Sequence, residues 1–301
     1  MISQDTSSLL VAGEQVMNRP ARALIGWLAP NEAVTMLLGR NPNPGDNVDA
    51  QVKASEPYRD AVARREPYVP TDPIVDDHQF SDQLEDIAAR PTVQATFHGL
   101  VWRTAVVDLT HVLSFQKIVF TDGPGMDSEH IVTASLTELC LPVEQLLPPT
   151  GALTDPDGKG FTISSLNTNL RIVGGQLSDA NVAPGPGLPS VRMQAVTLLV
   201  SMGTSYMQVV RYRDRWFLRD GYHRASRLLR SGISIVPCIY IEANTFQEVQ
   251  AGVGAFPFEV LFGDRPPALK DFWDDTVAAG ISQLAIRKVI RVRGEEFAVP
   301  R

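Results

Sequence analysis

Cysteine is scarce in this chain of 301 residues, which contains only Cys140 and Cys238. Both lie in apolar stretches, LCLP and VPCIYI. This setting favours two buried small side chains over the alternatives, a disulfide or a metal-binding pair.

Long apolar runs are absent as well. No run approaches about eighteen uninterrupted apolar residues, so no transmembrane helix is expected. The first residues, MISQDTSSLLVAGEQVM, place no basic segment before an apolar core and so do not resemble a secretory signal. The compartment expected from the sequence is the cytoplasm.

The chain also lacks an excess of positive charge. Its net charge is −7 and its pI is near 5.3, whereas surfaces for nucleic acids and anionic membranes depend on a basic face. DNA and membranes are therefore not expected partners. With 44% hydrophobic and 20% charged residues, the composition is that of an ordinary globular protein.

Common catalytic and nucleotide-binding signatures are missing too. There is no GxxxxGK[ST] loop and no strand-linked GxGxxG. His98, His111 and His130 are scattered, and no Ser or Cys partner suggests a hydrolase triad.

Two acidic groups offer ligands for a metal ion. Metal binding is the less favoured interpretation for both, because carboxylates at these positions commonly cap helices or lie in solvent at helix starts. The groups are Asp76-Asp77-His78 and the set Asp264, Asp271, Asp274 and Asp275.

The most informative segment is WFLRDGYHRASRLLRSG, from Trp216 to Gly232, in which an apolar strand leads through DGYHR into a helix. A helix N-terminus presents unpaired N–H groups and a partial positive charge, which suit phosphate. Gly221 allows a backbone conformation closed to other residues, and Arg224 supplies a planar fork for phosphate oxygens.

The charge around this segment is strongly positive. Residues 211–230 hold seven Arg and two Asp in an otherwise acidic chain. Such a local field suits a small anion better than a long polyanion. The alternative is a strand–turn–helix unit whose arginines are simply solvated.

Periodicity and breaker residues predict an α/β (α+β) protein. Residues 1–90 are expected to form a helical region, 91–245 the main domain with an insertion near 120–190, and 246–301 a mixed extension. Asn31 is expected to cap a helix that ends at Gly39. Strands are expected at 100–107, 161–177, 207–211, 215–219, 235–242 and 288–293, a helix at 192–202, and loops at 148–160 and 180–189.

From Val191 to Ala243, the order helix, Ser-Met-Gly, strand, DGYHR, helix, Gly, Val-Pro, strand resembles the ParB/sulfiredoxin superfamily. Members of that superfamily carry GERR, GGCHR or DGHHR at this turn. The stretch from Val107-Asp108-Leu109 to Phe115-Gln116 looks like their first conserved box. The likeness covers less than a third of the chain, and only the DGYHR context is specific.

The resemblance implies that the turn binds the phosphates of a nucleotide. In the superfamily this nucleotide is CTP in the chromosome-partition proteins, ATP in sulfiredoxin and ADP in the free-serine kinases. Sulfiredoxin has a cysteine where this chain has Tyr222, so sulfinic-acid reduction is not expected. The partition proteins continue into a helix-turn-helix, which the residues after Ala243 do not suggest. The DGHHR of the serine kinases differs only at Tyr222. Those kinases use a glutamate as base near the first box, where this chain has the neutral Gln116, with Asp108 close by.

The function implied by the resemblance is binding of a nucleotide (ATP, ADP or CTP) or another phosphate-bearing small molecule, with Mg²⁺-dependent phosphoryl transfer or nucleotide hydrolysis. Asp220 is the expected metal ligand or base, with His223 and Arg224 as phosphate clamps. Further expected ligand-binding residues are Arg219, Gly221, Tyr222, Arg227, Gln116, Gly203, Thr204 and Ser205. The alternative is a non-catalytic module that senses a nucleotide or docks a partner, including a second copy of the chain.

Overall fold

The computed structural model describes residues 18–40, 42–122, 136–142, 151–154, 160–165, 170–182, 191–202, 205–251, 254–284 and 288–294. The chain divides into two compact units. The larger unit joins Val16–Val143 to Ser205–Ala285, and the smaller one joins Met1–Gln15, Glu144–Thr204 and Ile286–Arg301. The larger unit thus draws on all three segments expected from the sequence.

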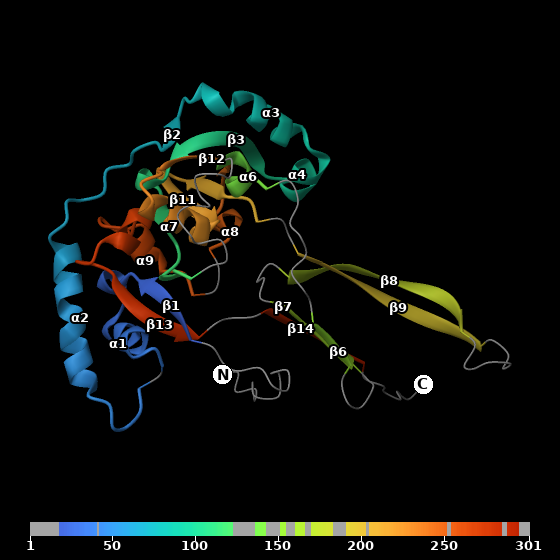
Figure 1. The fold of residues 1–301 in the computed structure, drawn as a ribbon, viewed down its shortest axis with the longest axis horizontal. Helices are drawn as coiled ribbons and strands as arrows, with labels where there is room; N and C mark the ends of the chain where they lie inside the picture. The colour runs from blue at the N-terminus through green and yellow to red at the C-terminus, as the bar shows by residue number, and fades with distance from the viewer. Residues whose placement is uncertain are drawn as a thin grey trace. The chain divides into compact units, whose positions relative to one another are not determined.

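A six-stranded mixed sheet is the centre of the larger unit (Figure 1). Strands β10 and β12 are parallel, as are β11 and β4, and the remaining neighbours are antiparallel. In spatial order the strands are β2 (Ile74–Val75), β3 (Val101–Asp108), β12 (Ile235–Glu242), β10 (Gln208–Tyr212), β11 (Arg215–Asp220) and β4 (Leu113–Ser114). Helices together with mixed and antiparallel sheets confirm the expected α/β (α+β) class.

A second, antiparallel sheet in the same unit corrects one expectation. Residues Asn18–Ala23 form strand β1 rather than helix, between β13 (Ala279–Leu284) and β5 (Ile118–Phe120). Both partners lie far along the chain, and their backbone groups satisfy those of β1. Local propensity contains no signal for such a distant pairing.

Short helices surround these sheets. Helix α1 (Pro30–Leu38) ends at Gly39 (φ 69°), as expected, but its N-cap is Ala29, so Asn31 lies inside the helix and does not cap it. Pro30 occupies the first turn, where its missing N–H costs nothing. The other helices are α2 (Val48–Ala63), α3 (Ser81–Ala89), α4 (Pro91–Thr96), α6 (Leu136–Cys140), α7 (Tyr222–Arg230), α8 (Phe246–Val249) and α9 (Phe258–Leu261), with 3-10 turns η2 (Ile25–Trp27), η3 (His78–Phe80), η4 (Leu109–His111) and η5 (Leu269–Trp273).

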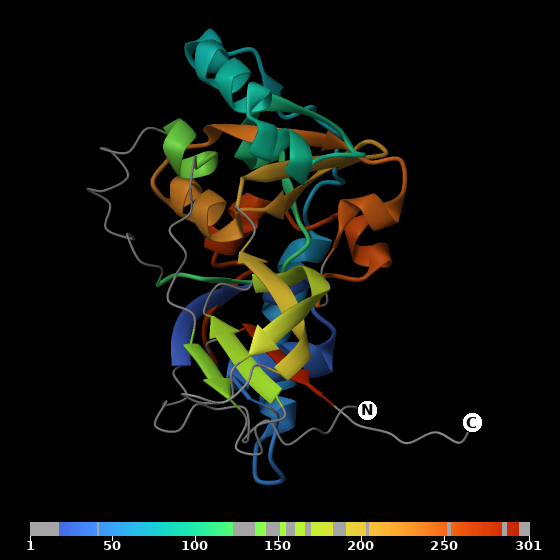
Figure 2. The same ribbon diagram turned by 90° about the vertical axis from the view of Figure 1, so that its right-hand side faces the viewer.

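The described residues of the smaller unit form two antiparallel sheets. One has the order β14 (Lys288–Arg293), β7 (Gly160–Ser165), β6 (Gly151–Thr154), so the predicted basic strand is confirmed while the loop expected at 148–160 contains a strand. The other pairs β8 (Leu170–Val182) with β9 (Val191–Met202) in a long ribbon (Figure 1), which is foreshortened in Figure 2.

Strand β9 overturns the helix predicted for 192–202. Its β-branched residues pack well on a pleated surface, and its backbone pairs with β8 along nearly its whole length. The loop expected at 180–189 begins later than predicted, because β8 extends to Val182. The remainder of that loop lies outside the described residues.

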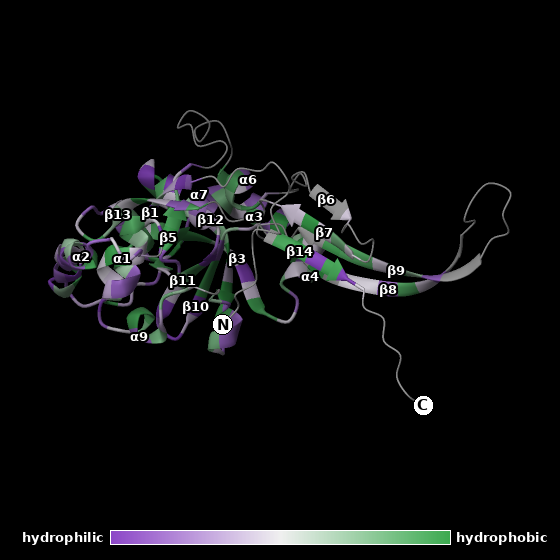
Figure 3. Ribbon diagram, turned by 90° about the horizontal axis from the view of Figure 1, so that it is seen from below, coloured by the Kyte–Doolittle hydropathy of each residue, from purple (hydrophilic) through white to green (hydrophobic). Residues whose placement is uncertain are grey.

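The core of the larger unit is formed by the central sheet and the helices against it. Strand β3 carries both hydrophilic and hydrophobic residues along its length (Figure 3), and its residues Ala105, Val106 and Val107 are buried. Cys140 and Cys238 are buried and free, which confirms their predicted role as small core side chains. Among the described helices, none has both the length and the apolar character required to cross a bilayer.

Candidate functional site

The DGYHR segment forms the predicted turn between β11 and α7. Gly221 precedes the helix with φ 96° and ψ 18°, in the left-handed region that favours glycine. The turn is also tight, because a Cβ at this position would lie 3.2 Å from the Cα of Met207 and 3.4 Å from Nη2 of Arg224. Gly221 therefore lets the turn pack against the segment leading into β10.

The N-terminus of α7 has no side-chain cap. The N–H of Gly221 donates to Oδ1 of Asp220 at 2.7 Å. The N–H groups of the first turn, beginning with those of Tyr222 and His223, have no acceptor within the helix. These donors are available to an anion.

Asp220, Ser205 and Arg224 form a polar cluster beside this turn. Nη2 of Arg224 donates to Oγ of Ser205 at 2.9 Å, and Ser205 Oγ lies 3.4 Å from each carboxylate oxygen of Asp220. Burial raises the pKa of Asp220 above its usual value, although Arg224 and the N–H of Gly221 act in the opposite direction. A carboxylate with a raised pKa is a better proton acceptor than an exposed one.

Arg224 also joins α7 to the end of α6. Its Nη1 donates to the carbonyl oxygen of Leu139 at 2.9 Å and to that of Cys140 at 3.4 Å. These carbonyls belong to the last turn of α6, where the helix itself provides no donors. Sequence reasoning missed this contact, because α6 lies far from DGYHR in the chain and has no motif that marks it.

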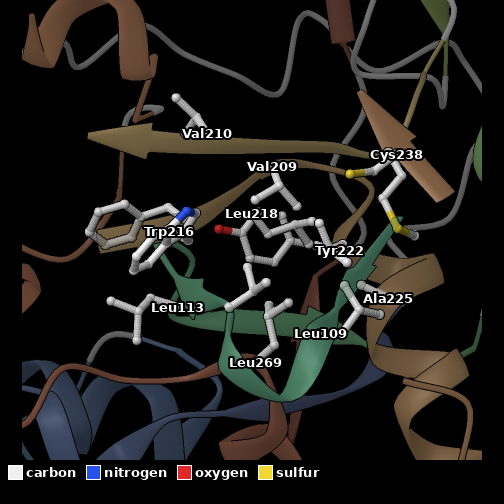
Figure 4. Packing of buried hydrophobic residues seen from close by; sticks show 14 of the residues in the cluster. Leu109, Leu113, Val209, Val210, Trp216, Leu218, Tyr222, Ala225, Cys238 and Leu269 are labelled. Carbon is white, nitrogen blue, oxygen red and sulfur yellow. The ribbon is translucent and has the colours of Figure 1, made fainter. Parts of the chain in front are cut away.

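Tyr222 is placed in the core. Its hydroxyl accepts a hydrogen bond from the N–H of Phe115 at 2.7 Å, and its ring lies among apolar side chains that include Leu218 and Ala225 (Figure 4). We therefore assign the side chain of Tyr222 to the contact between α7 and the stretch after η4, and we do not count this side chain among the ligand-binding groups.

Replacing Tyr222 with Phe should destabilise the fold by about 1–3 kcal/mol, because the buried N–H of Phe115 loses its acceptor. Urea unfolding measures the loss. Tyr212→Phe is the control, since the ring contacts of Tyr212 with Phe246 and Phe262 do not depend on its hydroxyl. Equal stabilities of the two variants would contradict the assignment of Tyr222.

His223 lies on the exposed side of α7. The centroid of its ring is 5.9 Å from that of Phe120, and the guanidinium of Arg19 lies 4.5 Å from the same Phe120 ring. Desolvation by this packing lowers the pKa of His223, and a hydrogen bond to the Phe120 backbone opposes the shift. A lowered pKa favours the neutral imidazole, which suits proton exchange or hydrogen bonding better than charge clamping.

Arg219, which precedes Asp220 in β11, and Arg227 of α7 hold unsatisfied donors. Nε and Nη1 of Arg219, and Nε of Arg227, are buried and have no hydrogen-bond partner among the described residues. Burial lowers the pKa of Arg219, and neighbouring Asp220 opposes that shift. A buried donor without an acceptor is uncommon in a folded protein, and an oxygen atom of a ligand would satisfy it.

Gln116 and Asp108, from the predicted first box, form contacts of their own. Gln116 is exposed, and its carbonyl oxygen accepts from Oγ of Ser114 at 2.8 Å. Asp108 accepts from N and Oγ1 of Thr110 at 2.9 and 2.8 Å, and thereby caps η4. Gly203 and Thr204 lie outside the described residues.

The two acidic groups proposed as possible metal ligands have other contacts. Asp77 accepts from the N–H of Gln79 and caps η3, as the favoured interpretation expected. Asp271 is only 3% exposed, which corrects the expectation of a solvated helix start, and it is held by Arg65 and the N–H of Ala268. Within the described part of the chain, no three His, Cys, Asp or Glu side chains are grouped as a metal site would require.

Comparison of the chain with protein-family models, curated proteins and solved structures finds no match. The resemblance to the ParB/sulfiredoxin superfamily therefore rests on the residues alone, in the order strand, DGYHR, helix, strand over residues 208–242, because the helix that it places at 192–202 is strand β9.

Proposed function

We propose that the β11–α7 turn binds the phosphate groups of a nucleotide or a related small molecule, on a ParB/sulfiredoxin-like domain. The observation that carries the proposal is the set of unused donors around the turn. The first turn of α7 has no side-chain cap, and Arg219 and Arg227 each hold a buried guanidinium nitrogen without an acceptor among the described residues. Phosphate oxygens satisfy both kinds of donor.

The chemistry that we propose is phosphoryl transfer to an acceptor hydroxyl or to water. The attacking oxygen forms a bond to phosphorus while the bond to the leaving phosphate oxygen breaks, and the proton of the attacking group passes to Asp220. Arg219, Arg227 and the N–H groups of α7 stabilise the charge on the phosphate.

In the alternative role, Asp220 would hold a magnesium ion together with phosphate oxygens; the ion would supply further charge neutralisation, and Asp220 would then not be the base. Mg²⁺ is commonly bound by one or two carboxylates plus substrate phosphates, so a single protein carboxylate is compatible with this arrangement. The raised pKa of Asp220 has burial as its main cause, and a bound cation would lower it again.

A second candidate function is a non-catalytic nucleotide-sensing or partner-docking module. The observation that favours it is the engagement of Arg224, whose guanidinium already contacts Leu139, Cys140 and Ser205. A cation held in this way contributes to the fold whether or not a ligand is bound.

Binding is tested by calorimetry and thermal shift with ATP, ADP and CTP, each with and without Mg²⁺. We expect Arg219→Ala to weaken nucleotide affinity by about tenfold or more, because charge-assisted contacts are lost. Without ligand, the variant should melt at or above the wild-type temperature, since no hydrogen bond of Nε or Nη1 is removed. Arg213→Ala is the matched control, because Arg213 lies in the β10–β11 turn at the other end of both strands.

Turnover separates the two candidate functions. Asp220→Asn should retain nucleotide binding and lose phosphate release, whereas a sensing module should show no release in the wild type. For testing whether Arg224 contributes to nucleotide binding, Arg224→Lys is preferable to Arg224→Ala, because the alanine variant also loses the contacts to α6. If no nucleotide binds the wild-type protein, or Arg219→Ala binds as tightly as wild type, the proposed site is wrong.

A further inference from the structure

A separate cleft of about 220 Å³ lies in the larger unit, away from the residues of the β11–α7 turn. One wall is the connector that follows α2, from Arg65 to Val69. The other wall comes from η4, β4 and the segment 265–271. None of the ligand-binding residues of the β11–α7 turn lines this cleft.

Tyr68 supplies an unused polar group at this cleft. Its hydroxyl is buried and has no hydrogen-bond partner within the described residues. The guanidinium of Arg215 lies 5.0 Å from the centre of the Tyr68 ring and is itself held by the carbonyl oxygens of Leu261 and Gly263 at 2.8 Å. The packing that fixes the ring therefore leaves its hydroxyl without a hydrogen bond. This is unfavourable unless a ligand supplies the partner.

The charges lining the cleft are unequally compensated. Arg65 is paired with Asp271 and Asp274 at 2.9 and 2.6 Å, so these charges offset one another. Lys270 and Arg265 also line the cleft, and neither has a described carboxylate within 4 Å, although Lys270 acts electrostatically on Asp271 and Nε of Arg265 donates to the carbonyl oxygen of Arg65. Glu66 is the other carboxylate of the lining, and it is exposed to solvent.

Apolar side chains complete the lining. Val69 is 74% exposed and Leu113 is almost fully buried, so the cleft offers an apolar surface both at its rim and at its base. Its volume is below the roughly 300–1,000 Å³ of pockets that hold drug-sized molecules. The cleft therefore suits a small ligand.

We infer that this cleft binds a small organic anion, a carboxylate or a phosphate monoester with a compact apolar body. The anionic group of the ligand lies between Lys270 and Arg265. Another atom of the ligand accepts a hydrogen bond from the hydroxyl of Tyr68. The inference does not depend on the function proposed for the β11–α7 turn.

The test is calorimetric titration with benzoate and phenyl phosphate, using benzylamine as a cation of similar shape. Benzoate or phenyl phosphate should bind and benzylamine should not. Lys270→Ala should weaken anion binding by about tenfold, because a charge-assisted contact is lost. Lys53→Ala, which removes the same charge from exposed α2, is the matched control and should bind as wild type does.

Tyr68→Phe distinguishes a ligand-binding hydroxyl from a structural one. It should weaken anion binding by roughly fivefold while leaving the melting temperature of the free protein unchanged or higher, because it removes an unsatisfied buried group. Arg219→Ala should leave benzoate binding intact, which separates this site from the turn. Absence of binding by both anions, equal binding of benzylamine, or unaltered affinity in Lys270→Ala would each overturn the inference.

Discussion

Gly221→Ala should destabilise the larger unit by about 2–5 kcal/mol, for two reasons that add. The residue has φ 96°, where a side chain is strained, and a Cβ would lie 3.2 Å from the backbone Cα of Met207. A backbone atom cannot rotate away as a flexible side chain does, so the strand or the helix must shift. Urea unfolding followed by circular dichroism measures the loss.

Gly232→Ala is the control for the first reason alone. Gly232 follows α7 with φ 78°, and nothing lies within 4 Å of a Cβ built on it. We expect a cost of about 1–2 kcal/mol there, from backbone strain only. If the two variants lose equal stability, close packing against Met207 contributes nothing at the β11–α7 turn, and backbone strain alone explains the glycine.

The course of the chain around DGYHR was predictable because its signals are local. Apolar residues between two turns predicted β11, and the glycine followed by helix-forming residues predicted α7. The adjoining strand β10 and the buried strand β12 were also found near their predicted positions. In each case a few residues that are neighbours in sequence determine the conformation of the backbone.

Other elements depend on partners that are distant in the chain. Strand β1 exists because β13 and β5 satisfy its backbone, and β9 is extended because β8 pairs with it. The same holds for side chains at the site. DGYHR identified Arg224 as a cation, but only the fold shows that its guanidinium contacts the carbonyls of Leu139 and Cys140. The environment of Tyr68 was not predictable from the sequence either. Nothing near it in sequence predicts a buried hydroxyl that lacks a partner among the described residues.

Arg65→Ala should cost about 2–4 kcal/mol, because it leaves the carboxylate of Asp271 buried without its cation. The side chain of Asp271 is 4% exposed and that of Arg65 28%, with 2.9 Å between Nη1 and Oδ2. Arg19→Ala is a closely matched control. Arg19 is also 28% exposed and also pairs with an aspartate at 2.9 Å, but that aspartate, Asp122, is 38% exposed. We expect about 1 kcal/mol or less for this solvated pair.

The effect of pH provides an independent check on Asp271. Burial raises the pKa of Asp271 above its ordinary value of 3.8, despite the opposing influence of the Ala268 N–H and Arg65. For a carboxyl group whose pKa is raised on folding, the stabilising contribution is complete below 3.8 and is lost as the pH rises through the folded-state pKa.

Removing Arg65 should raise the pKa of Asp271 further, so the stability deficit of Arg65→Ala should grow as the pH rises above about 4 and shrink toward acid pH. Asp271→Asn should not show this growth, because its amide carries no charge and can still accept from the N–H of Ala268. Urea unfolding of both variants at about pH 4.5 and about pH 7 measures the difference. A deficit for Arg65→Ala that stays constant with pH would mean that the ionised carboxylate of Asp271 is not the source of the instability.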